Sequence, residues 1–404
     1  MEPKLTLFSI IMLLGSAHGL FLALALVNTK SGDRLGHFFL ALLTLAFAID
    51  LGHEFLYQSR YLLNVLSLAY VDPAINLVYG PSLYLYVRAL TEGSAFKLKG
   101  LGWLHFLPVA IGAAVCLLLP DLSQEQFTKL FYEDEMAAVG KENIVQSAIS
   151  SIAMASVISL GIYLVLSISR LISHAKRIRQ QFSSIERITL NWLRNLLVAI
   201  SALYLILIFG GYFSQLFGLN ESVNNLLYLM IVAVIYTMGY LGLRQPVIFT
   251  GPLLDVDNLS KASVLPINDE ENSDVGLDAN NKYKTSSLDS EMSAALRTEL
   301  QQYMEVESPH LDSKLTLPQL AKQIGISPNY LSQVINEQYN KNFFDFINDY
   351  RVEEAKRLLA DSAKADLSII SIAYDSGFNS KSAFYTAFKK NVGITPSKFR
   401  TSVE

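Results

Sequence analysis

The chain has 404 residues, of which 51% are hydrophobic and only 17% are charged, with a formal net charge of −4. About 25% of the residues of a soluble globular protein are charged, so these averages exclude an ordinary soluble protein. The single cysteine, Cys116, excludes an internal disulfide, and no Cys/His spacing indicates a zinc site.

The first part of the sequence contains seven long apolar segments. The first, about Leu5–Val27, begins like a signal peptide, but its apolar run is long enough to cross a bilayer, so we interpret it as a retained span. The other six lie at about His37–Tyr57, Tyr70–Leu90, Trp103–Leu119, Gln146–Leu171, Trp192–Phe217 and Asn225–Leu243. The third contains Pro73 and Pro81 and is the weakest, although neighbouring helices tolerate such breaks. The sequence therefore predicts a membrane domain of about seven helices over residues 1–250, surrounded by the lipid bilayer.

The distribution of lysine and arginine predicts the orientation of these spans. If the N-terminus lies outside, the inner flanks hold Lys30, Arg34, Arg88, Lys97, Lys99, Arg170, Lys176, Arg177, Arg179, Arg187 and Arg194. The outer flanks hold only Lys4, Arg60, Lys129 and Lys141. Because positive residues accumulate on the cytoplasmic side, we expect a multi-pass protein of the bacterial cytoplasmic (inner) membrane, with its C-terminal domain in the cytoplasm.

Several polar residues are predicted to lie in the outer half of the bilayer. They are Asp50, His53 and Glu54 on one face of the second span, Asp72 and Asn76 at the start of the third, and Gln215 at the end of the sixth. Ionisable groups inside a membrane are functional candidates. Two main interpretations stay open: a pocket for a small-molecule or membrane signal, or polar pairs that lock the helices together. A metal or catalytic centre is a third, but no catalytic motif supports it and we predict no cofactor.

The composition changes after the last apolar segment. Residues 251–289 are acidic and polar, which is typical of a flexible linker. An amphipathic connecting helix is predicted within 290–310, because Met292, Leu296, Leu300 and Tyr303 follow helical spacing. This helix could pack on the domain that follows or pair with its twin in a homodimer.

Residues 311–404 contain two copies of a helix-turn-helix pattern. In the first copy, Thr316 caps a short helix, Gly325 makes the turn, and Ser327 caps a second helix that runs from Pro328 to about Gln338. In the second copy, Ser368, Gly377 and Ser380 take the same roles, and the second helix spans Lys381–Lys390. A long helix, about Phe343–Leu359, joins the two copies. Helical spacing groups five of its residues along one side: Phe344, Ile347, Arg351, Ala355 and Leu358.

The second helix of each copy has a polar outward face. The outward residues are Asn329, Ser332, Gln333 and Asn336 in the first copy and Lys381, Ser382, Tyr385 and Thr386 in the second. Amide and hydroxyl side chains can read base edges in the major groove. Ser313–Thr401 has twelve Lys and Arg against eight Asp and Glu, a net charge of +4 that favours phosphate binding.

The stretch from Leu315 to Arg400 resembles the DNA-binding domain of the AraC/XylS family of transcriptional regulators. The resemblance is strongest at Ile372–Phe378, Phe384–Lys390 and Gly393–Arg400. It implies that each unit places its second helix in the major groove and that the outward residues are the base readers. The first recognition helix departs from some members, because it lacks their arginine or tryptophan. The N-terminal part resembles the membrane-embedded variety of such regulators, through Gly80–Val87 and Leu104–Pro108.

The predicted fold class is all-α, with a multi-span transmembrane bundle and a helical DNA-binding domain. We expect a non-enzymatic one-component sensor and activator that binds double-stranded DNA and contacts RNA polymerase. The sequence does not decide whether it forms a homodimer. Two other functions are kept: a transporter or membrane enzyme with a fused regulatory tail, and a regulator whose spans act only as a tether.

Overall fold

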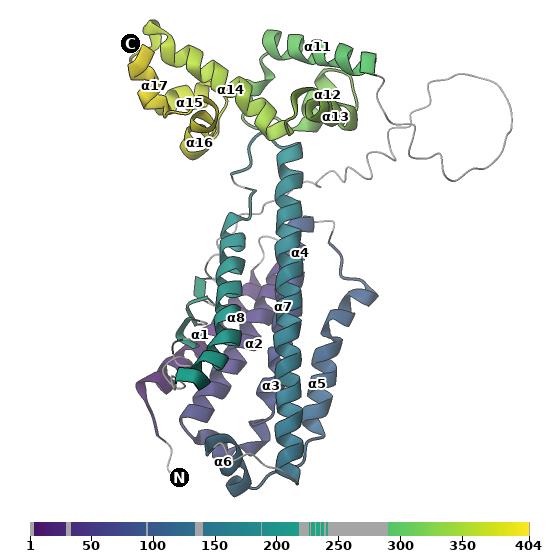
Figure 1. Ribbon diagram of the computed structural model, residues 1–404, viewed down its shortest axis with the longest axis vertical. Coiled ribbons are helices and arrows are strands. Elements are labelled where there is room, and N and C mark those ends of the chain that lie inside the picture. The colour runs from purple at the N-terminus through teal and green to yellow at the C-terminus, as the bar shows by residue number, and fades with distance from the viewer. Residues whose placement is uncertain are drawn as a thin grey trace, which may run out of the picture. The chain divides into compact units, whose positions relative to one another are not determined.

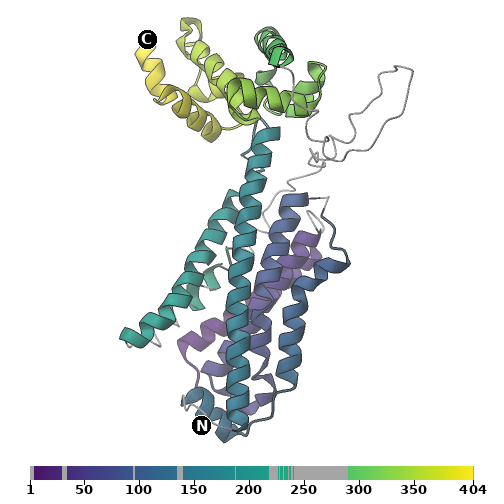
Figure 2. The same ribbon diagram turned by 45° about the vertical axis from the view of Figure 1, so that its right-hand side comes forward.

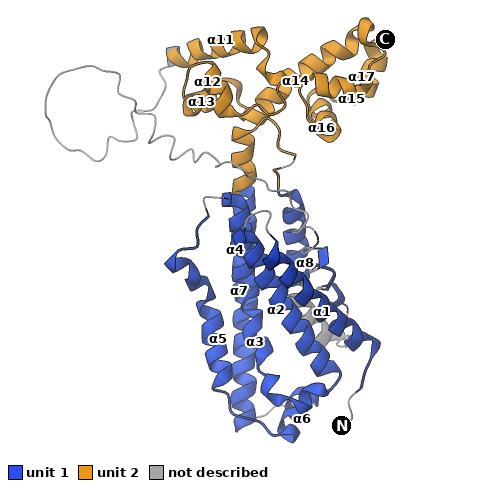
Figure 3. Cartoon of the chain, turned by 180° about the vertical axis from the view of Figure 1, so that it is seen from behind, with its two compact units in different colours: residues 1–172, 190–253 blue, residues 173–189, 254–404 orange. Residues whose placement is uncertain are grey.

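The computed structural model describes residues 4–29, 34–93, 96–133, 140–186, 188–217, several positions within 226–240, and 290–403. All regular elements in these ranges are helices, which confirms the predicted all-α class, and one isolated β-bridge joins Phe182 and Thr316. The chain divides into two compact units (Figure 3). The first unit is Met1–Ile172 with Leu190–Leu253, and the second is Ser173–Thr189 with Leu254–Glu404.

The first unit is built from long helices that run beside one another (Figures 1 and 2). Its elements are α1 (Leu7–Asn28), α2 (Arg34–Gln58), α3 (Val71–Asn76), α4 (Tyr79–Glu92), a 3-10 helix (Gly100–Phe106), α5 (Leu107–Leu117), α6 (Gln124–Tyr132), most of α7 (Lys141–Gln181) and α8 (Asn191–Phe217). Two short 3-10 turns, Tyr61–Asn64 and Leu66–Leu68, follow α2.

Four helical stretches in the described part of the chain are long and apolar enough to cross a membrane. They are Leu7–Asn28, Arg34–Gln58, Gly100–Leu117 and Lys141–Gln181, and Asn191–Ile206 is a shorter apolar stretch. The predicted third span is divided into α3 and α4, and Pro81 lies in the first turn of α4, where its missing N–H costs little. The predicted seventh span is described only at separate positions within 226–240. The number of membrane crossings therefore stays a prediction.

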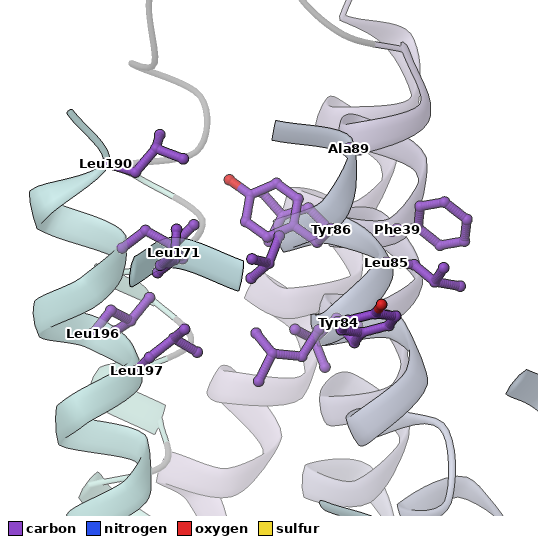
Figure 4. Packing of buried hydrophobic residues seen from close by; sticks show 14 of the residues in the cluster. Phe39, Tyr84, Leu85, Tyr86, Ala89, Leu171, Leu190, Leu196 and Leu197 are labelled. Atoms are coloured by element: carbon purple, nitrogen blue, oxygen red, sulfur yellow. The ribbon is translucent and has the colours of Figure 1, made fainter. Parts of the chain in front are cut away.

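Close helix contacts and several apolar clusters hold the first unit together. The hydroxyl of Ser16 on α1 donates a 2.7 Å hydrogen bond to the carbonyl of Ala48 on α2, so small residues bring these backbones together. The main core joins α2, α4, α7 and α8 through Phe39, Tyr86, Leu171 and Leu197 (Figure 4). Many other large apolar side chains of these helices are exposed.

The second unit contains the C-terminal helices. They are α11 (Ser290–Val306), α12 (Leu317–Gln323), α13 (Pro328–Tyr339), α14 (Phe343–Ala360), α15 (Ile369–Asp375), α16 (Lys381–Val392) and α17 (Pro396–Val403), with 3-10 turns at Pro309–Leu311 and Ser362–Lys364. One core gathers α11 to α13 on the first half of α14, and a second gathers α15 to α17 on its other half. Each core is therefore completed by the same long helix.

Helix α11 packs on the domain that follows it, which answers one question that the sequence left open. Leu300 and Met304 lie in the first core with exposed fractions of 1% and 0%. The amide of Gln338 on α13 donates to the hydroxyl of Ser293 at 3.0 Å, and the Arg297 guanidinium lies 5.4 Å from the ring centroid of Tyr339.

Candidate nucleic-acid interface

The first helix-turn-helix unit is set by local capping interactions. The Thr316 hydroxyl accepts a hydrogen bond from the Gln319 amide, and the Gln319 side chain accepts from the Thr316 amide, which is a reciprocal capping box. Ser327 caps α13 by accepting from the amide of Tyr330 at 3.2 Å. These contacts confirm the predicted caps and fix the direction in which α13 leaves the turn.

The second helix-turn-helix unit repeats this construction. Ser368 caps α15 by accepting from the amide of Ser371 at 3.0 Å, and Ser380 caps α16 by accepting from the amide of Ala383 at 3.2 Å. Both predicted caps are confirmed. Helix α16 continues to Val392, two residues beyond the predicted Lys390.

Both turns use a glycine with positive φ, but the surroundings of the two glycines differ. Gly325 has φ +75° and open space around the position of a Cβ. Gly377 has φ +86°, and a Cβ there would meet the carbonyl oxygen of His310 at 2.4 Å and Cα of Leu311 at 2.9 Å. Both positions therefore need glycine for a positive φ, and position 377 needs it also because another backbone segment lies close to it.

Polar contacts also fasten the second recognition helix to α14. The Lys390 ammonium donates to Asp345 at 2.7 Å, and the Asn391 amide donates to Asp349 at 3.0 Å. Lys341 pairs with the same Asp349. The two helix-turn-helix units are therefore connected through α14 by side-chain hydrogen bonds as well as by apolar packing.

The predicted readers of α13 have at least partial access to solvent, and three of them take part in hydrogen bonds within the helix. Asn336 is exposed, and Asn329, Ser332 and Gln333 are half-buried. The Asn336 amide donates to the Ser332 carbonyl at 2.8 Å, and the Gln333 amide donates to Glu337 at 2.9 Å. Reading a base with Gln333 or Asn336 therefore requires the exchange of an intrahelical bond for a bond to DNA.

The predicted readers of α16 are more accessible. Lys381, Ser382 and Thr386 are exposed, and Tyr385 is half-buried. The Lys381 ammonium lies 5.5 Å from the ring centroid of Tyr385, a cation–π contact that orients both side chains. The structure thus places all eight predicted residues on the two second helices with at least partial access to solvent.

Some candidate contacts were missed by the sequence reasoning. Tyr330, in the first turn of α13, is 45% exposed, and its place beside Asn329 was the available signal. Lys322 and Lys389 are exposed and form no ion pair within the described part of the chain, which suits them for phosphate contacts.

Arg351 lies on α14 between the two helix-turn-helix units and is only 1% exposed. Its Nε donates to the His310 carbonyl at 2.8 Å, and Nη2 donates to the Asp312 carbonyl at 2.9 Å. Burial lowers the pKa of Arg351 to about 10, so the guanidinium stays charged at neutral pH. A buried charge of this kind needs hydrogen-bond acceptors on every side.

In the first unit, four of the six predicted polar residues come together. Asp50 and Glu54 are 8% and 9% exposed, and both interact with Asp72, whose carboxylate accepts from the Asn76 amide at 3.3 Å. His53 has an attractive charge interaction with Glu54. The side chain of Gln215 lies outside the described residues.

Two tyrosines that the sequence reasoning missed complete this cluster. Tyr79 interacts with Asp50, and Tyr228 interacts with Glu54. The Glu54 carboxylate also accepts from the Gln58 amide at 2.7 Å. Within the described ranges, no group of three or more His, Cys, Asp and Glu side chains is arranged to hold a metal ion.

Comparison with known proteins finds relatives of the C-terminal part. A family described as a helix-turn-helix domain matches residues 320–402. The HTH-type transcriptional regulator YtdP of Bacillus subtilis is 33% identical over 89 residues, which are 22% of this chain and 11% of that protein. The melibiose operon regulatory protein of Escherichia coli is 32% identical over 89 residues, which are 22% of this chain and 28% of that protein.

A solved structure is similar to the same part. It is the C-terminal domain of the two-component response regulator yesN from Fusobacterium nucleatum, with 31% identity, 26% of this chain and 98% of that chain covered, and a TM-score of 0.23. The chain spans only 11% and 28% of the two curated relatives named above. The matched residues form a helix-turn-helix domain of a DNA-binding type. They are similar to parts of two transcriptional regulators.

Proposed function

We propose that this chain is a membrane-anchored, sequence-specific DNA-binding transcriptional regulator. The observation that carries the proposal is the pair of capped helix-turn-helix units, both built on α14 and each with an accessible polar second helix. Two such helices held by one rigid helix suit a bipartite site in double-stranded DNA.

The chemistry of the two helices favours different bases. Asn and Gln side chains can bond both N6 and N7 of adenine, so Asn329, Gln333 and Asn336 favour adenine in one half of the site. Lys381 can donate to O6 and N7 of guanine, and the methyl group of Thr386 can contact thymine in the other half. Lys322 and Lys389 would bind phosphates and set the position of the domain.

The test is to map the chromosomal binding sites of the full chain and to measure its affinity for the recovered sequence. We expect Lys381→Ala and Asn336→Ala to lose discrimination in different halves of the site, by about 1–3 kcal/mol each. Thr298→Ala on the exposed face of α11 is the matched control. Equal affinity of the chain for recovered and scrambled sequences would remove the proposal of sequence-specific binding.

We further propose that the first unit anchors the chain in the bacterial cytoplasmic membrane with the second unit in the cytoplasm. The four long apolar helices and the excess of lysine and arginine on the predicted inner flanks support this. Reporters that are active on one side only, fused after Asp121 and after Glu404, test the orientation. The same side for both fusions would contradict the proposed orientation.

The cluster around Asp50, Glu54 and Asp72 is proposed as the site of the signal. Its carboxyl groups and the hydroxyls of Tyr79 and Tyr228 would complement a ligand with a cationic group. Such a ligand can regulate only if it binds two states of the bundle unequally, with the output reaching RNA polymerase through the DNA-bound domain. Asp50→Asn and Asp72→Asn should abolish the response of a reporter while DNA binding is retained. Glu125→Gln, at an exposed position in the first turn of α6, is the control. An unchanged response in both Asp50→Asn and Asp72→Asn would exclude the site.

A further inference from the structure

The second unit contains more than the C-terminal domain. It also includes Ser173–Thr189, the end of α7 and the segment that leads to α8. Ile178, Ser183 and Ile185 in this stretch are 0%, 1% and 8% exposed. A loop between two predicted spans is thus buried in the unit that holds the DNA-binding helices.

The contact is formed by backbone atoms and one serine. Phe182 and Thr316 form an antiparallel β-bridge, and the amide of Ser183 donates to the carbonyl of Leu315 at 3.2 Å. The hydroxyl of Ser183 donates to the same carbonyl at 2.6 Å. Thr316 is the N-cap of α12, so the loop is bonded to the backbone where the first helix-turn-helix unit begins.

Arg351 connects this loop to the part of α14 that lies between the two helix-turn-helix units. Its Nη1 donates to the carbonyl of Ser183 at 2.8 Å, and its Nη2 donates to the hydroxyl of Ser183 at 3.0 Å. The other short bonds of the guanidinium go to the carbonyls of His310 and Asp312. Half of its short hydrogen bonds therefore depend on residue 183, and Glu186 adds an attractive charge.

We infer that Phe182–Ile185 is an intramolecular docking segment for the DNA-binding domain, with Arg351 as its receptor. The regulatory consequence rests on the proposed function. A change in α7 would reach the joint of the two helix-turn-helix units through a contact that begins one residue after the helix ends. Coupling between α7 and the DNA-binding domain would then not depend on residues 251–289.

The test uses the full chain in membranes with Cys116→Ala, which removes its only cysteine. Phe182→Cys and Thr316→Cys are introduced, together with a specific protease site within residues 251–289. Facing residues of a β-bridge are close enough for a disulfide after a small adjustment. After oxidation and cleavage, we expect most fragments to stay linked until they are reduced. The matched control pair is Phe182→Cys with Thr386→Cys, on the exposed side of α16, which should stay unlinked.

A second variant tests the hydrogen bonds themselves. Ser183→Pro removes the amide donor and should slow disulfide formation about tenfold, because several bonds of modest strength act together. Ser184→Ala removes only one long contact to Arg351, at 3.4 Å, and should change the rate less than about twofold. A rate for the Phe182/Thr316 pair equal to that of the control pair, or insensitive to Ser183→Pro, would overturn the inference.

The two proposals fail in different ways. Sequence-specific DNA binding is measured on the same membranes, so DNA binding without the cross-link rejects the docking segment alone. A cross-link without DNA binding rejects the proposed function and leaves the docking intact. In cells with equal amounts of protein, Ser183→Pro should shift reporter output at least about threefold relative to Ser184→Ala, and equal outputs would reject the regulatory role.

Discussion

The turn of the second helix-turn-helix unit offers a sharp test of how the domain is assembled. Gly377→Ala places a methyl group 2.4 Å from the His310 carbonyl oxygen, which is backbone and cannot swing aside. The positive φ costs an alanine about 1–2 kcal/mol. Forced movement of a packed neighbour costs about 1–3 kcal/mol more. We therefore expect a loss of about 2–5 kcal/mol in the free energy of unfolding.

Gly325→Ala is the matched control, because its φ is also positive but no heavy atom lies within 4 Å of the added Cβ. Its free energy of unfolding should fall only by the cost of a positive φ for alanine, about 1–2 kcal/mol. Urea unfolding of the fragment Ser290–Glu404 can be followed by circular dichroism, since both tryptophans of the chain lie outside it. At about 1–3 kcal/mol per molar urea, the midpoints of the two variants should differ by roughly 1 M. Equal midpoints would refute the argument that the 310–311 segment and this turn are packed backbone to backbone.

Two further predictions concern pH and salt. Burial lowers the pKa of His310 below its ordinary value of 6.5, so the unfolded chain binds more protons below that pH. The stability of the fragment should therefore fall as the pH drops below about 6.5 and level off beneath the folded-state pKa, with a slope of at most about 1.4 kcal/mol per pH unit that His310→Gln removes. For DNA binding, Lys322→Ala and Lys389→Ala should each reduce the slope of log affinity against log salt by about 0.9. Lys356→Ala, whose ammonium is paired with Glu353 at 2.8 Å, should change this slope less, and identical slopes would show that the free lysines do not contact phosphate.

The C-terminal domain was largely predictable because its signals are local. A cap such as Thr316 or Ser380 acts within three residues, so its effect can be read from the sequence alone. The long joining helix was predicted to within one residue at its end, but one of its buried aromatics was assigned wrongly. Phe344 was expected on the inner side, whereas Phe343 and Phe346 are the buried ones. Adjacent aromatic residues give periodicity arguments little power to choose between faces.

The polar cluster was only partly predictable, for a reason that lies in tertiary structure. Asp50 and Glu54 stand out because charges are rare in an apolar segment. Tyr79 and Tyr228 do not stand out, since tyrosine is common in such segments, and their meeting with these carboxyl groups depends on how distant helices pack. A single sequence contains no record of that packing.

Arg351 shows the same limit most clearly, and it yields a last prediction. Its periodicity placed it on the inner side of the long helix, but its partner Ser183 lies 168 residues earlier in the chain. Arg351→Lys keeps the positive charge, yet one ammonium has three donors and cannot replace a planar fork that reaches Ser183, His310 and Asp312 together. We expect this variant to lose about 1–3 kcal/mol of domain stability, because carbonyl acceptors stay buried without donors. It should also slow the Phe182/Thr316 cross-link as much as Ser183→Pro does. A stable Arg351→Lys domain with an unchanged cross-linking rate would mean that charge alone holds the loop, and that the hydrogen-bond geometry described for residue 183 is not what docks it.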